Sequence, residues 1–115
     1  MLIVHRSCAG LDVHKRTIVA CCLKFDSDET PHHQTRTFGT TTAELLALLD
    51  WLQEWEVSAV ALESTGEFWK PVHNILEGSL EVLLVNAHHV KNVPGRKTDC
   101  KDAQWLAELL QHGLL

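Results

Sequence analysis

The chain has 115 residues, of which 22% are charged and 45% hydrophobic, and this composition is that of an ordinary globular domain and not of a disordered segment. The length suits one domain with a buried core, and no apolar run approaches the ~20 residues that cross a bilayer. The N-terminus is too short and wrongly flanked for a signal peptide. We therefore expect a cytoplasmic protein without membrane contact.

The formal net charge of −5 is unusual for a protein that binds nucleic acid, because such proteins are commonly basic. The distribution of the charge is more informative than its sum. Basic residues gather around Asp99 and directly after Asp12. These residues are Lys91, Arg96, Lys97 and Lys101, and then Lys15 and Arg16. Positive charge therefore lies beside two acidic residues, although a solvated loop has the same pattern.

Cysteine and histidine spacing argues against disulfides and structural zinc. The four cysteines (8, 21, 22 and 100) include no Cys-x-x-Cys pair, and a bridge between the vicinal residues would be strained. The eight histidines show no His-x₃₋₅-His spacing combined with a cysteine pair. We expect free cysteines in a reducing compartment.

Three strands are expected to open the chain. Residues 7–13 are mostly apolar, as in a strand buried on both faces, and Asp12 is the carboxylate among them. Residues 17–25 are rich in β-branched side chains, and the short link before them predicts an antiparallel hairpin. The polar residues 26–33 predict an exposed turn, which leads to a short third strand at 34–38.

A helix and a buried strand follow. Thr41 is the expected N-cap, and Glu44 occupies the third helical position of a capping box. Leucines at helical spacing extend this helix to about residue 55. Residues 58–62 then form a buried strand, and Glu63 stands at its carboxyl end before a Ser-Thr-Gly turn.

The remaining chain predicts two helices and one strand. Residues 67–76 are helical in pattern, but Pro71 requires this helix to begin late or to kink. A fifth strand is expected at 80–85. The last helix should begin at residue 97 or 98 and end near Gly113.

The resulting order βββαβαβα predicts an α/β protein with a mixed five-stranded sheet and helices on both faces, which is the ribonuclease H-like fold. In this fold the first and fourth strands are parallel neighbours, so Asp12 and Glu63 project from adjacent carboxyl ends. Asp99 and Asp102 are three residues apart and should face the same side of the last helix.

Carboxylates brought this close repel one another, and one would be protonated unless a cation joined them. Hard divalent ions with oxygen ligands resolve this conflict, and Mg²⁺ is the natural choice. Two such ions ~4 Å apart can clamp a phosphate during phosphodiester chemistry. We therefore predict that Asp12, Glu63, Asp99 and Asp102 form a two-ion site.

Each acid also has a simpler local interpretation. Asp99 and Asp102 could cap a helix and interact with its positive end. Glu63 could be a turn residue. Asp12 is harder to explain in this way, because a single acid in an apolar strand has no structural reason.

Three segments resemble the motifs of one protein family. They are Gly-Leu-Asp-Val-His-Lys at 10–15, Ala-Leu-Glu-Ser-Thr-Gly at 61–66 and Pro-Gly-Arg-Lys-Thr-Asp-Cys-Lys-Asp-Ala at 94–103. Their order and spacing cover nearly the whole chain, and the third is long and distinctive. The sequence thus resembles the DEDD transposases of the bacterial insertion-sequence 110 family, also called bridge-RNA-guided recombinases.

This resemblance implies a RuvC-like catalytic domain that cleaves and rejoins DNA strands in transposition. It implies that the four acids named above bind Mg²⁺, with Mn²⁺ as a substitute. DNA and a structured guide RNA are the implied partners, and we expect a homo-oligomer in the full-length form. The candidate contacts to the nucleic-acid backbone are Lys15, Arg96, Lys97 and Lys101, although a solvated charge at a helix start is an equal alternative for each.

Family members continue into a helical segment and a second domain with a serine nucleophile, whereas this sequence ends at Leu115. We therefore expect residues 1–115 to be the RuvC-like domain alone, incomplete for recombination. Two alternatives stay open: a RuvC-like junction nuclease, and a non-catalytic remnant that folds and binds nucleic acid or self-associates. An actin-like sugar kinase is disfavoured, because Val-His-Lys and not a glycine-rich loop follows Asp12.

Overall fold

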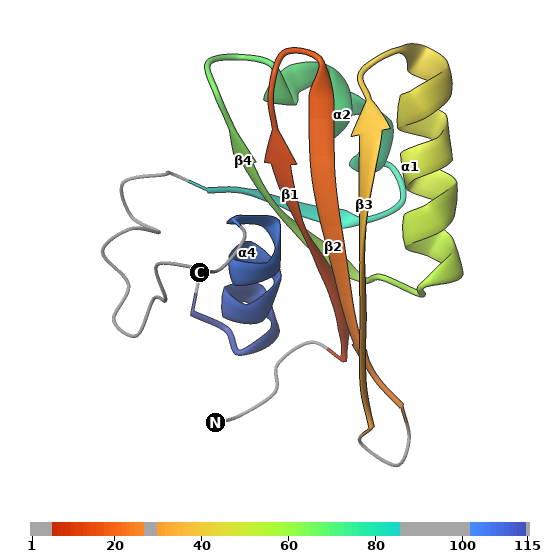
Figure 1. Cartoon of the computed structure of the whole chain (residues 1–115), viewed down its shortest axis with the longest axis vertical. Helices are drawn as coiled ribbons and strands as arrows, with labels where there is room; N and C mark the ends of the chain where they lie inside the picture. Colours follow the sequence, from red (N-terminus) through yellow and green to blue (C-terminus); the bar gives the residue numbers. More distant parts are fainter. Residues whose placement is uncertain (1–5, 27–29, 86–101, 115) are drawn as a thin grey trace.

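The computed structural model describes residues 6–26, 30–85 and 102–114, and Figure 1 shows the whole chain. In this part of the chain five strands and three helices follow the order that the sequence predicts. The strands are β1 (Ser7–Val13), β2 (Thr17–Phe25), β3 (Pro31–Gly39), β4 (Ala59–Ser64) and β5 (Glu81–Leu84). The helices are α1 (Thr42–Glu54), α2 (Trp69–Leu76) and α4 (Asp102–Gln111).

The strands form one mixed sheet in the order β3-β2-β1-β4-β5. The first three strands pair antiparallel, whereas β4 is parallel to both β1 and β5. The central pair β1–β4 aligns Asp12 with Glu63. The expected mixed five-stranded sheet, with the first and fourth strands as parallel neighbours, is confirmed.

Helices cover both faces of the sheet, as expected. Successive side chains of a strand point to opposite faces, so each central strand contributes to two separate cores. In β1, Leu11 and Val13 join the core beneath α1 and α2, whereas Cys8 joins the core beneath α4. Figure 1 shows α1 and α2 on one side of the sheet and α4 on the other. No helix within the described ranges is long and apolar enough to span a membrane.

Gly10 allows α4 to lie directly against β1. A Cβ atom on Gly10 would stand 2.1 Å from the carbonyl oxygen of Ala103 and 2.6 Å from the backbone nitrogen of Ala107. The Cys8 thiol is 3.4 Å from the carbonyl oxygen of Ala107. Because the helix advances from Gly10 toward Cys8, α4 runs opposite to β1. Its first residue, Asp102, therefore lies toward the end of β1 that carries Asp12.

The helix termini follow their expected chemistry with one difference. Thr41 caps α1 through its hydroxyl, which accepts a 3.3 Å hydrogen bond from the Glu44 backbone nitrogen. The Glu44 carboxylate accepts from the Gly39 nitrogen at 3.0 Å, so it ties the end of β3 to α1 instead of closing a capping box on Thr41. At the other end of the chain, Gly113 adopts φ 70° and ends α4, as expected.

Several element bounds differ from the sequence expectation. The third strand begins at Pro31 and not at residue 34, because β2 extends its antiparallel pairing to Phe25 opposite Pro31. An edge strand needs few apolar side chains, so its exposed polar residues gave no strand pattern. The helix α2 begins at Trp69, which places Pro71 in its first turn, where no intrahelical N–H bond is required. The expected start of the last helix at 97 or 98 lies outside the described residues.

We predict that Gly10→Ala destabilises the chain by about 1–3 kcal/mol, because the new methyl group overlaps backbone atoms of α4 that cannot rotate away. Urea unfolding measures this change in the free energy of unfolding. Gly78→Ala is the matched control, since a Cβ there meets no atom within 4 Å. Equal stabilities for the two variants would mean that α4 does not pack on β1 at Gly10.

Leu48→Ala should cost about 2–5 kcal/mol, because Leu48 is fully buried between α1 and the sheet and its truncation leaves a cavity. Leu46, on the same helix, is 47% exposed, so Leu46→Ala should change the free energy of unfolding by no more than about 0.5 kcal/mol. Thermal and urea unfolding of both variants measure these changes. If Leu48→Ala did not reduce the stability, the assignment of the buried face of α1 would be wrong.

Candidate active site

The structure aligns two carboxylates on one face of the sheet. Asp12 and Glu63 are register partners on the parallel strands β1 and β4. By alternation, Asp12 shares the face of Cys8, and Glu63 shares the face of Ala59 and Ala61. All three of these apolar residues belong to the core beneath α4. Both acids therefore project on the α4 side of the sheet.

This placement brings two acidic side chains to neighbouring positions of the sheet. Neighbouring strands lie only about 4.8 Å apart, so two ionised side chains at paired positions repel each other. The Asp12 side chain is 17% exposed, which leaves little water to screen its charge. Glu63 is likewise partly buried. A proton or a cation between them would relieve the repulsion.

The start of α4 lies toward the same end of β1. Asp102 is the first residue of this helix, and its backbone lies on the Asp12 side of the contact between Gly10 and Ala103. The Asp102 side chain and all of Asp99 lie outside the described part of the chain. Within that part, no three or more Asp, Glu, His or Cys residues gather where they could hold a metal ion. The four-carboxylate site remains a prediction, of which the structure describes the Asp12–Glu63 pair.

His14 and Thr65 also belong to this site, and sequence reasoning missed both. The Nε2 atom of His14 is 3.2 Å from Oδ1 of Asp12, and its Nδ1 atom is 3.1 Å from the hydroxyl oxygen of Thr65. The sequence could have indicated His14, because it is two residues after Asp12, and residues two apart in an extended segment point to the same face. Thr65 could not be found in this way, since its position depends on the turn after β4.

The basic residue candidates are only partly described. Lys15 is exposed in the turn between β1 and β2, next to His14. The Thr40 hydroxyl donates a 3.1 Å hydrogen bond to the Lys15 carbonyl oxygen and so ties this turn to the end of β3. Arg96, Lys97 and Lys101 lie outside the described residues. Contact of these four side chains with nucleic acid remains a prediction.

Burial keeps the thiols of Cys8 and Cys22 protonated at neutral pH. Cys8, Cys21 and Cys22 are buried, and their sulfur atoms are not joined in disulfides. Burial, and to a smaller extent the neighbouring Cys21, raises the pKa of Cys8 to about 12. Burial, followed by the same neighbour, also raises the pKa of Cys22 above its usual range. Because the thiolate is the reactive and ligating form, these side chains stay inert at neutral pH.

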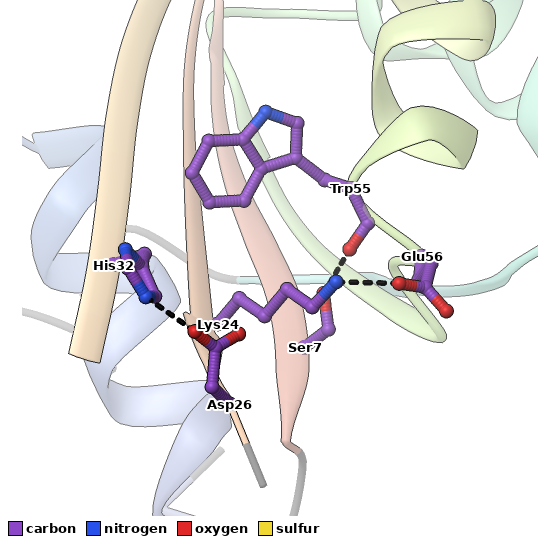
Figure 2. Close-up of polar contacts among 6 residues, drawn as sticks. All are labelled: Ser7, Lys24, Asp26, His32, Trp55 and Glu56. Carbon is purple, nitrogen blue, oxygen red and sulfur yellow. Dashed lines mark hydrogen bonds and ion pairs between the residues drawn. The ribbon is translucent and has the colours of Figure 1, made fainter. Parts of the chain in front are cut away.

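A second polar cluster lies at the opposite end of the sheet, beside the first residue of β1 (Figure 2). There Lys24 pairs with Glu56, and Asp26 pairs with His32 at 2.6 Å. The Ser7 hydroxyl donates a 2.6 Å hydrogen bond to the carbonyl oxygen of Trp55.

A cleft of about 410 Å³ opens beside these polar contacts. Its lining residues are Lys24, Asp26, His32, Glu54 and Trp55. The cleft is separate from the Asp12–Glu63 pair.

The sequence of this chain matches the model of a known protein family. A family model of DEDD transposases of the insertion-sequence 110 type, described as "Transposase", matches residues 9–115. The chain belongs to this transposase family. The resemblance seen in the sequence motifs is thereby confirmed. No curated protein matches the sequence of this transposase-family chain.

Two solved structures are similar to the transposase-family chain in fold. The resolvase of Fowlpox virus, solved with its substrate Holliday junction DNA, matches with TM-score 0.51 and 13% identity, over 80% of this chain and 65% of the resolvase. The Ppx/GppA family member of Aquifex aeolicus matches with TM-score 0.42 and 12% identity, over 73% of this chain and 36% of that one. The chain thus spans about two thirds of the resolvase. The likeness to the resolvase supports the ribonuclease H-like, RuvC-like fold.

We predict that Cys8 and Cys22 resist alkylation by iodoacetamide at pH 8 in the native chain and react quickly in urea, because folding keeps both thiols protonated and buried. Mass spectrometry of the digested peptides measures the labelling of each site. Stability should also fall as the pH rises above about 9, the usual thiol value, since the unfolded chain then loses protons that the folded chain retains. Fast native labelling of Cys8 would contradict its burial beneath α4.

Proposed function

We propose that this chain is the metal-binding catalytic domain of a transposase that cleaves and rejoins DNA strands. The observation that carries the proposal is the register of Asp12 with Glu63, on the face where α4 begins, in a member of a transposase family. Asp99 and Asp102 complete the proposed ligand set, as the sequence motif suggests. The carboxyl ends of parallel strands are the usual place for ligands in such sheets.

The described residues fit a hard divalent cation. Asp12 and Glu63 offer carboxylate oxygens from adjacent positions, and oxygen is the donor that Mg²⁺ prefers. A bound pair of Mg²⁺ ions would supply Lewis-acid stabilisation to a phosphodiester and its leaving oxygen. The protein itself contributes the repulsion between its acids, which favours cation binding, and the burial of Asp12, which limits competing water.

DNA as the substrate is supported by the family and by the local charge. Lys15 and Arg16 are exposed in the turn that follows the Asp12 strand, where they would contact phosphate groups. Two divalent ions would offset most of the net charge of −5, since −5 + 4 = −1. A structured guide RNA, assembly into a homo-oligomer and cooperation with a serine-bearing second domain belong to the same proposal, on the strength of the sequence motifs.

A RuvC-like junction nuclease is the second candidate. It is favoured by the fold likeness to a resolvase that was solved with Holliday junction DNA. Both candidates would use the same carboxylates, so loss of an acid does not separate them. The reaction products separate the two candidates. A nuclease leaves nicked strands, whereas a transposase in its full-length form also joins the cleaved strands to a new partner.

Metal binding is expected to stabilise the chain against heat. With Mn²⁺ or Mg²⁺ at 100 times its Kd, the gain is about 2.7 kcal/mol, which thermal melting detects as a higher Tm. The double variant Asp12→Asn plus Asp102→Asn should lose this shift. Asp50→Asn, which removes an exposed acid on α1, is the control and should keep it. A shift that survives in the double variant would exclude these carboxylates as the metal site and favour the non-catalytic alternative.

Strand cleavage in the full-length protein should fall at least 10²–10³-fold when Asp12→Asn, Glu63→Gln, Asp99→Asn or Asp102→Asn is introduced singly, because each change removes charge that stabilises the transition state through the metal. Gel analysis of a labelled DNA substrate measures both cleaved and joined strands. Wild-type rates in any one variant would remove that residue from the site.

A further inference from the structure

We propose that His14 is a positioning residue that fixes the orientation of the Asp12 carboxylate for the cation, with Thr65 fixing the imidazole in turn. This inference rests on the proposed metal site. It concerns a contact that joins two motifs of the sequence, the one that follows Gly10 and the one that follows Ala61. Through it, the turn after β4 acts on a ligand that belongs to β1.

The chemistry of the three side chains limits where the proton of the His14 ring can lie. The Nε2 atom of His14 lies 3.2 Å from Oδ1 of Asp12, and an ionised carboxylate can only accept, so a proton between the two atoms belongs to Nε2. In the neutral imidazole, Nδ1 is then an acceptor, and the Thr65 hydroxyl donates to it across 3.1 Å. With a neutral imidazole, the contacts of His14 with Thr65 and Asp12 therefore place the ring proton on Nε2.

The backbone holds both partners of the imidazole in place. The His14 nitrogen donates to the Thr17 carbonyl oxygen at 2.9 Å, which closes the turn between β1 and β2. The Thr65 nitrogen donates to the Val13 carbonyl oxygen at 3.1 Å, which holds the turn after β4 against the end of β1. The ring therefore spans two anchored turns and not two free loops.

The contact with His14 restricts the orientation of the Asp12 carboxylate. With Oδ1 held by the imidazole, rotation about the Cβ–Cγ bond is limited, and the second oxygen is presented in one direction. A hydrogen-bonding partner behind a metal ligand typically changes metal affinity 10–100-fold. The imidazole is 50% exposed, so its contribution to overall stability is small, and an effect on metal affinity can be separated from an effect on folding.

The first experiment measures the tautomer without any metal. In ¹⁵N NMR spectra of the chain at about pH 8.5, the His14 ring should show its proton on Nε2. Thr65→Val should shift the Nδ1 signal, whereas Thr65→Ser should preserve it. A ring protonated on Nδ1, or a mixture of tautomers unchanged by Thr65→Val, would overturn the assigned contacts.

The second experiment measures the Kd for Mn²⁺ by calorimetric titration of the chain. His14→Leu should raise this Kd about tenfold, and His14→Gln should recover most of the loss, since its amide nitrogen reaches the position of Nε2. Thr65→Val should also raise the Kd for Mn²⁺. The double variant His14→Leu plus Thr65→Val should lose less binding free energy than the sum of the losses in the two single variants. The free energy of unfolding without metal should stay within about 0.5 kcal/mol for each single variant.

His32→Leu is the matched control. His32 contacts the Asp26 carboxylate through the same ring nitrogen and is similarly exposed, at 48%, but lies at the opposite end of the sheet (Figure 2). It should leave the Kd for Mn²⁺ unchanged. If Asp12→Asn abolishes Mn²⁺ binding while His14→Leu has no effect, the positioning role alone is wrong. If the wild-type chain and Asp12→Asn bind Mn²⁺ equally or not at all, the proposed metal site fails and the positioning role fails with it.

Discussion

The proposed metal site depends on the placement of two carboxylates at paired positions of adjacent parallel strands. Asp12 and Glu63 occupy the α4 side of the sheet, where the residues before them in both strands are buried. Ionised carboxylates at paired positions of adjacent strands repel each other, and a positive partner between them relieves the repulsion. A chain of this size has only a small margin of stability, so such a repulsion is expected to serve a purpose. We propose that a divalent cation relieves this repulsion by binding between the two carboxylates.

The opposite face of the sheet supplies the rigidity that this site needs. The core beneath α1 and α2 contains Leu11, Val13 and Leu62, which alternate with the two acids along β1 and β4. Asp12 is therefore flanked on both sides, and Glu63 on one side, by side chains that are closely packed on the other face. On the α4 side, Gly10 and the small residues Ala103 and Ala107 let the helix approach the strand directly. The start of α4 is thus fixed relative to Asp12.

The central part of this arrangement could be predicted from the sequence. The order of the elements placed Asp12 beside Glu63, because three hairpin-linked strands followed by αβαβα units leave few possible topologies. The membership in a transposase family followed from three quoted motifs. The contact of Gly10 with α4 could not be predicted, since it depends on the distance between two elements far apart in the sequence. The roles of the four acids remain a prediction.

The structure differs from the sequence-based expectations where contacts between distant segments override the local sequence pattern. Residues His32 and His33 were expected in a turn, but backbone pairing with β2 places both in an edge strand whose side chains stay in water. The contact between His14 and Thr65 depends on how two turns meet above the sheet, and no spacing rule encodes that meeting. Local sequence reports propensity and burial, whereas these features depend on which segments become neighbours.

The most direct test of the carboxylate site is paramagnetic broadening by Mn²⁺ in ¹H–¹⁵N NMR spectra of the chain. Substoichiometric Mn²⁺ should broaden the amide signals of Asp12, Glu63 and Asp102 first and leave those at the opposite end, such as Lys24 and Glu56, sharp. Broadening that is uniform, or that centres on the cleft beside Trp55, would contradict a metal site between β1 and β4.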